Sequence, residues 1–158
     1  MKLQLIFITI FAASSVSYAA TRFSDSATAT ARQVVVHRLQ IEKTSDLNFG
    51  EASPGDGPKL VPAGTSENPE NASFAVRGEP SRMYQIVLPS HNSVVMATSG
   101  GGPNGQITIK EFYSWPIRYG IMNSNGESNI YVGALREGIK VKQKVGEYTG
   151  QFVVTVVY

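Results

Sequence analysis

Cysteine is absent from this chain of 158 residues, and histidine occurs only as His37 and His91. The first absence excludes disulfides, thiolate catalysis and lipid attachment at an N-terminal cysteine. The two histidines are far apart in sequence, and neither has the spacing of a metal ligand. No serine has the strand–turn–helix context of a nucleophile elbow. We therefore expect no catalytic residue, no metal site and no cofactor, and we predict that the protein is not an enzyme.

Charge is also scarce. Charged side chains make up 16% of the residues, whereas an ordinary soluble domain has roughly 25%. The formal net charge is +2, and it becomes +2 − 1 = +1 if Lys2 is removed with the leader described next. A charge this small gives no electrostatic basis for binding nucleic acid or an anionic membrane surface.

The sequence has one short apolar run, and it lies at the N-terminus. Lys2 precedes an apolar run from Leu3 to Ala13 that only Gln4 and Thr9 interrupt, and Ser17-Tyr18-Ala19 places small residues at positions −3 and −1 of a cleavage site. The run is well short of the about 20 residues that span a bilayer. We predict a signal peptide over residues 1–19 and export to the periplasm, the cell surface or a fimbrium. No membrane span is expected after its removal.

Helical periodicity is absent after the leader, and apolar and polar residues alternate instead. The alternating segments are residues 38–42, 73–77, 84–88, 106–110, 139–142 and 148–158. Clusters of Gly, Pro and Asn separate them, as between the strands of a sandwich or barrel. Strands with one polar face favour antiparallel pairing. The pattern predicts an all-β protein with an antiparallel immunoglobulin-like β-sandwich over residues 33–158.

The last segment shows the clearest alternation. One face carries apolar and aromatic side chains and the other carries Thr149, Gln151 and Thr155 among valines. The candidate residues of an edge strand at this position are Tyr148, Phe152, Val154, Val156 and Tyr158. The given sequence ends directly after this strand, so the sandwich is expected to lack a final strand. An uncovered apolar edge invites pairing with another chain.

Residues 20–32 form a Ser/Thr/Ala-rich segment between the leader and the domain. Phe23, Ala27, Ala29 and Ala31 share one face of this segment if it is extended. Two interpretations stay open for it. It is either a disordered N-terminal tail or an extended donor strand that pairs with an apolar edge.

Two other motifs could bind a ligand. Gly100, Gly102 and Gly105 match the dinucleotide fingerprint in letters, but a strand and not a helix follows them, so a hairpin loop explains them better. An aromatic cluster includes Trp115, Tyr113 and Tyr119. Core packing is one explanation for this cluster, and a sugar-binding platform of exposed rings is the other.

The final segment resembles a known type of ending. Val145 to Tyr158, with a Gly-x-Tyr turn at Gly146 and a terminal tyrosine, resembles the closing strand of the spore coat U and chaperone–usher pilin families. Upstream motifs resemble, in order, a family of small exported bacterial domains of unknown function that is similar to the same pilin group. The resemblance covers roughly Ile41 to Tyr158. These motifs are Leu47-Asn48-Phe49-Gly50, Pro62-Ala63-Gly64-Thr65, Phe74-Ala75-Val76-Arg77-Gly78-Glu79-Pro80, Tyr84-Gln85-Ile86-Val87-Leu88-Pro89 and Tyr131-Val132-Gly133.

The resemblance implies a structural subunit of a fimbria or cell-surface coat. In such proteins a periplasmic chaperone first covers the incomplete edge, and the N-terminal extension of the next subunit then replaces it. By this resemblance, the partners would be neighbouring identical or related subunits, a periplasmic chaperone and an outer-membrane usher. The alternative is a monomeric exported binding module, for example a glycan-binding adhesin, whose own residues 20–32 complete the sandwich.

Overall fold

The computed structural model describes residues 24–100 and 102–158. The chain divides into two units, one ending at Val34 and one spanning Val35–Tyr158. Among the described residues, all strands belong to the second unit, and the one helical turn is a 3-10 turn, η1 (Gly102–Asn104). The predicted all-β class is therefore confirmed.

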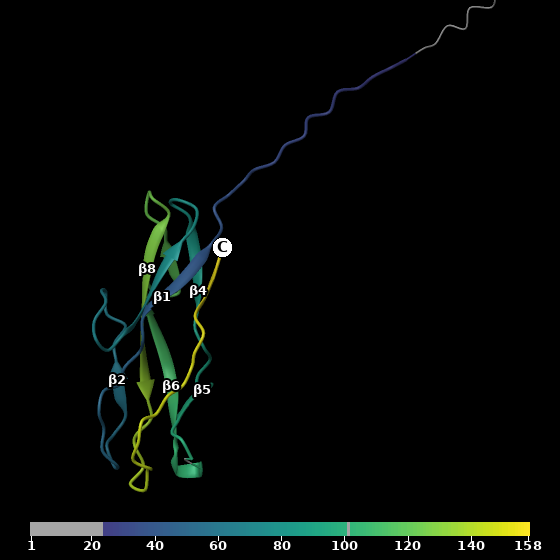
Figure 1. Cartoon of the computed structure of the whole chain (residues 1–158). Helices are drawn as coiled ribbons and strands as arrows, with labels where there is room; N and C mark the ends of the chain where they lie inside the picture. The colour runs from purple at the N-terminus through teal and green to yellow at the C-terminus, as the bar shows by residue number, and fades with distance from the viewer. Residues whose placement is uncertain (1–23, 101) are drawn as a thin grey trace, which may run out of the picture. The chain divides into compact units, whose positions relative to one another are not determined.

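The larger sheet has β8 (Glu127–Arg136) near its middle (Figure 1). On one side β8 pairs with β3 (Ala72–Arg77), which pairs with the edge strand β1 (Gln40–Ser45). On the other side β8 pairs with β6 (Gln106–Trp115), which pairs with the edge strand β5 (Val94–Ala97). The short β2 (Lys59–Val61) pairs with the last residues of β8. All of these pairings are antiparallel.

The smaller sheet has three strands. In it β4 (Met83–Val87) lies between β7 (Tyr119–Ile121) and β9 (Thr155–Val157), and both pairings are antiparallel. The predicted antiparallel sandwich is thus confirmed as two sheets. Its final strand, β9, stands at an edge of the smaller one.

The core lies between the inner faces of the two sheets. Alternation places Val76, Ile130 and Val132 of the larger sheet inside, and each has 0% of its surface exposed. From the smaller sheet, Tyr84 and Ile86 reach the same cluster with 1% and 5% exposure. Burial of alternate apolar residues from both sheets removes their surface from water and holds the sheets together.

One predicted strand does not form. Ile139 is buried, but Val141 is 83% exposed, and residues 139–142 contain a turn and no strand. The Ile139 N–H donates to the Asp56 carbonyl (2.7 Å), while the Gln143 N–H donates back to the Lys140 carbonyl (2.9 Å). The chain reverses here because this turn satisfies the backbone groups that a strand would have left for a neighbour.

Tyr84 provides a test of the core. Its hydroxyl donates to Ser128 Oγ (2.8 Å), and burial raises the pKa of Tyr84 above its ordinary 10.0. The folded-state pKa is above the unfolded-state value, so this contribution to stability is complete below pH 10.0 and is lost as the pH rises through the folded-state pKa. We expect Tyr84→Phe to lower the free energy of unfolding by about 1 kcal/mol at neutral pH. It should also flatten the loss of stability above pH 10.0.

Urea unfolding measured across this pH range checks the expectation. Tyr119→Phe is the matched control, because Tyr119 is 50% exposed and lies on the neighbouring strand. Equal slopes of stability against alkaline pH in the wild type and Tyr84→Phe would contradict it.

Candidate functional site

The C-terminal segment is paired along only one side. In β9, Thr155, Val156 and Val157 pair with β4, and further back Thr149 exchanges two backbone hydrogen bonds with Ala97 (2.9 and 3.1 Å). Within the part of the chain that the structure describes, no strand pairs with the other side of β9. This segment is the yellow one that ends at the C-terminus in Figure 1. The backbone donors and acceptors on its free side are therefore available to another strand.

The predicted alternation of this segment appears in its burial. Val154 is 8% exposed, whereas its neighbour Val153 is 73% exposed. Tyr148, Phe152 and Val156 are half-buried, and all three belong to the same predicted face. Tyr158 is 41% exposed, and its hydroxyl accepts the Glu79 N–H. The segment therefore presents one apolar face to the interior.

Apolar side chains become more exposed towards β1 and β9. In the larger sheet Ile41 on β1 is half-buried, while Val76, directly opposite on β3, is 0% exposed. In the smaller sheet Val156 on β9 is half-buried, while Ile86, opposite on β4, is 5% exposed. β1 and β9 approach each other but are not hydrogen-bonded neighbours. The sandwich is therefore less well covered between these two strands than at its centre.

We call this region the open edge and define it by five half-buried apolar residues that pack against the core: Leu39, Ile41, Phe74, Phe152 and Val156. The Phe152 ring lies 4.9 Å from the Phe112 ring and 6.4 Å, edge to face, from the Phe74 ring. Both spacings fall in the favourable range for aromatic pairs. Phe152 thus links the C-terminal segment to the larger sheet beneath the open edge.

A charged residue of β1 lies beside the open edge. Lys43 of β1 lies opposite the inward-facing Phe74, yet its side chain is 56% exposed and its Nζ lies 2.6 Å from Asp46 Oδ1. A lysine on the core-facing side of a strand remains solvated only where no neighbouring layer covers it. Its exposure shows that the smaller sheet does not cover Lys43.

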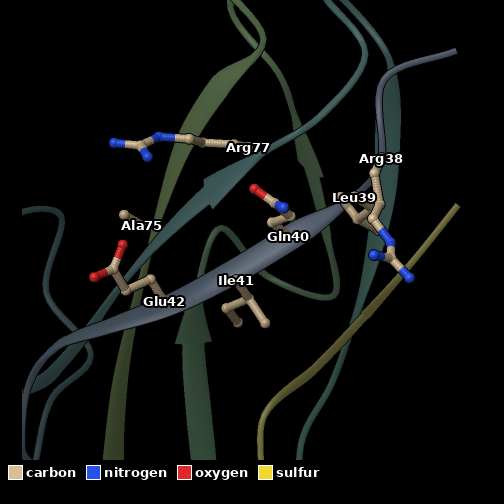
Figure 2. A pocket seen from close by; sticks show the side chains of 7 residues that line it. All are labelled: Arg38, Leu39, Gln40, Ile41, Glu42, Ala75 and Arg77. Carbon is tan, nitrogen blue, oxygen red and sulfur yellow. The ribbon is translucent and has the colours of Figure 1, made fainter.

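A pocket of about 400 Å³ lies at β1 and β3. Figure 2 shows Ile41 projecting to the opposite side of β1 from Gln40 and Glu42, and Arg38 extending toward the C-terminal segment. The complete lining is Arg38, Leu39, Gln40, Ile41, Glu42, Ala75 and Arg77. The pocket combines apolar, cationic and anionic side chains along one edge strand, and it has no convergent set of catalytic groups.

One end of the open edge is tied by a group of polar contacts. The His37 N–H donates to Glu79 Oε2 (2.8 Å), and His37 Nδ1 lies 3.2 Å from the same oxygen. This backbone hydrogen bond is the main cause that lowers the pKa of Glu79 below its ordinary 4.5. The Arg82 guanidinium lies 3.9 Å from the centre of the Tyr158 ring. The residues before β1, the β3–β4 turn and the C-terminus are thereby joined.

The structure separates the predicted aromatic cluster. Trp115 and Tyr113 lie on β6 of the larger sheet and are 45% and 38% exposed, whereas Tyr119 lies on β7 of the smaller sheet. Tyr131 of β8, opposite Trp115, joins them instead. The sequence pattern alone missed Tyr131, because the alternation of β8 assigns its face but not its partner on β6.

The predicted donor residues are only partly described. Ala27, Ala29 and Ala31 are exposed and lie outside any strand. Phe23 lies outside the described residues. Ala27, Ala29 and Ala31 all belong to the unit that ends at Val34.

Among residues 24–100 and 102–158, no group of three or more His, Asp and Glu side chains is placed to hold a metal ion. In the same residues, no helix is long and apolar enough to cross a bilayer.

Together these features define an antiparallel β-sandwich domain whose last strand, β9, is paired on one side only. The chain belongs to the family described as a domain of unknown function (DUF4402), whose pattern matches residues 39–158. The match includes β1, β9 and the whole open edge. No curated protein and no solved structure matches the chain.

Phe152 provides the test of this site. Phe152→Ala removes a ring that packs on Phe112 and Phe74, and we expect it to lower the free energy of unfolding by about 3 kcal/mol. Val153→Ala, at the adjacent and 73% exposed position, should change it by less than about 0.5 kcal/mol. Urea unfolding of the two variants distinguishes them. Equal losses would show that the C-terminal segment does not face the core by alternation.

Proposed function

We propose that the protein is a non-enzymatic structural subunit of a fimbria or cell-surface coat. In this proposal the open edge accepts an extended strand from a neighbouring subunit. The observation that carries the proposal is the one-sided pairing of β9, combined with the half-buried apolar side chains between β9 and β1. An edge of this kind is a template for strand addition.

Two interactions would stabilise the added strand. A strand beside β9 would pair backbone groups on its free side, and its alternate side chains would cover Leu39, Ile41 and Phe74. Removing apolar surface from water stabilises by about 25 cal/mol per Å². A donor that comes from a second copy makes a head-to-tail contact that does not close, and repetition of such a contact produces a fibre.

The donor that we propose is residues 20–32. Phe23, Ala27, Ala29 and Ala31 would face the acceptor, and Tyr148, Phe152, Val154, Val156 and Tyr158 would border it. At about 3.3 Å per residue, an extended segment of this length reaches about 40 Å, similar to the reach of residues 148–158. The Phe152 and Phe74 rings already occupy space beneath the open edge. The small side chains of alanine would therefore fit above them.

The resemblance to spore coat U and pilin subunits extends the proposal to assembly. Export would follow from the leader at residues 1–19. A periplasmic chaperone would cover the open edge before assembly, and an outer-membrane usher would exchange it for the next subunit. The chaperone is needed in this scheme because an uncovered apolar edge promotes aggregation.

The first experiment compares the protein beginning at Ala20 with a form beginning at Gln33. We expect the longer form to make concentration-dependent oligomers that survive detergent without boiling. The shorter form should be monomeric and less stable, because nothing covers the open edge. Light scattering gives the masses and urea unfolding gives the stabilities. Adding a peptide of residues 20–32 should restabilise the shorter form as its concentration exceeds the dissociation constant.

Two other outcomes would contradict the proposal. If both forms are equally stable monomers, residues 20–32 do not act as a strand. If the longer form is a monomer that is more stable than the shorter one, the segment pairs within its own subunit, and the protein is a self-completed binding module.

Two single substitutions test the face of the donor. Ala29→Asp places a carboxylate on the face that would be buried against the acceptor, and we expect it to abolish the oligomers, because an unpaired buried charge is very costly. Thr28→Asp adds the same charge to the opposite face, and oligomers should persist. Equal effects of the two substitutions would overturn the assigned face of the donor strand.

A further inference from the structure

The outer face of the larger sheet carries three aromatic residues at neighbouring positions of two paired strands. Trp115 on β6 and Tyr131 on β8 are directly opposite in the register. The sequence neighbours of Tyr131, Ile130 and Val132, are completely buried, so alternation directs Tyr131 outward, on the same face as Trp115. Tyr113, two residues before Trp115 on β6, also faces outward and is 38% exposed. We call Trp115, Tyr131 and Tyr113 the aromatic strip.

A hydrogen-bonded carboxylate lies at one end of the strip. Glu111 follows the same alternation, and its Oε2 accepts the Tyr113 hydroxyl at 2.7 Å. Its Oε1 lies 3.3 Å from His91 Nε2. The hydrogen bond to Glu111 raises the pKa of Tyr113 above its ordinary 10.0. Two side chains from different segments therefore fix the orientation of this carboxylate.

The two outer faces of the sandwich differ in chemistry. On the smaller sheet the outward residues include the aliphatic Met83, Ile121 and Val157, with 59%, 66% and 44% exposure. Such a surface offers burial but few directional contacts. The aromatic strip provides flat rings and hydroxyl groups, and Glu111 and His91 beside it add a carboxylate and an imidazole. Flat apolar surface beside a few fixed polar groups is the combination that binds small hydroxylated ligands with defined orientation.

We propose that the aromatic strip with Glu111 and His91 binds a neutral glycan. A sugar ring has an apolar face that stacks on an aromatic ring and a rim of hydroxyls that donate to a carboxylate. Tyr113 and Trp115 are two residues apart on one strand, about 7 Å along it, so two linked rings can contact them at once. The Glu111 carboxylate disfavours acidic sugars, because the negative charge of a bound acidic sugar would be repelled by the carboxylate. This site is on a different face from the open edge, and its occupation does not depend on strand acceptance.

The test uses the full chain from Ala20 and the emission of Trp115, which is the single tryptophan in the sequence. The probes are soluble oligosaccharides of glucose and of N-acetylglucosamine, with an oligogalacturonate as the acidic counterpart. We expect a saturable change in Trp115 emission with at least one neutral probe below about 10 mM, which corresponds to a weak single-site interaction. The acidic probe should bind at least about fivefold more weakly.

Two variants keep the reporter and change the site. Tyr113→Ala removes one stacking surface and Glu111→Gln removes the charge that accepts the sugar hydroxyls. Each should weaken neutral-glycan binding by about fivefold or more, measured by the same titration. Tyr119→Ala is the matched control, because it removes an exposed tyrosine from the other sheet. It should leave binding unchanged. Circular dichroism melting confirms that every variant folds.

Three results would overturn the proposal. The first is no change in Trp115 emission with any neutral probe. The second is a response that Tyr119→Ala weakens as much as Tyr113→Ala does. The third is emission that depends on protein concentration and not on sugar, because a second copy of the chain would then cover the strip.

Discussion

The pairing of β8 is the constraint on which the rest of the structure depends. This strand pairs with β3, β2 and β6, so it joins both halves of the larger sheet. Its inward residues Ile130, Val132 and Ala134 are all 0% exposed. Its outward Gly133 lies beneath the backbone of residues 61–63, where any Cβ would overlap the chain. Packing on both faces and pairing on both sides leave β8 no freedom to shift register.

The inward-facing side chains differ in burial between the centre of the sandwich and the edge formed by β1 and β9. The inward-facing residues of β8 and β4 are buried, while the inward-facing Ile41 of β1 and Val156 of β9 are half-buried. Three antiparallel strands in the smaller sheet cover only part of a larger sheet that reaches from β1 to β5. The side chains left uncovered are those of the open edge, and the solvated Lys43 lies beside them. The proposed strand acceptance is therefore a consequence of unequal sheets.

The two proposals use separate parts of the same scaffold. Strand acceptance uses the backbone of an edge and the apolar side chains between the sheets. Glycan binding uses Tyr113, Trp115 and Tyr131 on the outer face, and these residues do not belong to the core between the sheets. A subunit that presents its outer face while its edge is covered by a neighbour could perform both tasks.

The sequence by itself determined the class of the fold and the faces of the strands. Alternation at Phe74 and Val76, at Tyr84 and Ile86, and at Phe152, Val154 and Val156 is a local property of an extended chain, and these residues are buried or half-buried as expected. Of the predicted last strand, residues 148–158, only Thr155–Val157 form a strand. Local alternation also misassigned residues 139–142, since a turn and contacts with Asp56 satisfy that backbone. Which strands are neighbours could not be read locally, because pairing joins residues far apart in the chain. Only the tertiary structure decided that Tyr131, and not Tyr119, lies opposite Trp115. It also decided that β9 is paired on one side. Both results depend on the order and register of the strands, which join residues far apart in the chain.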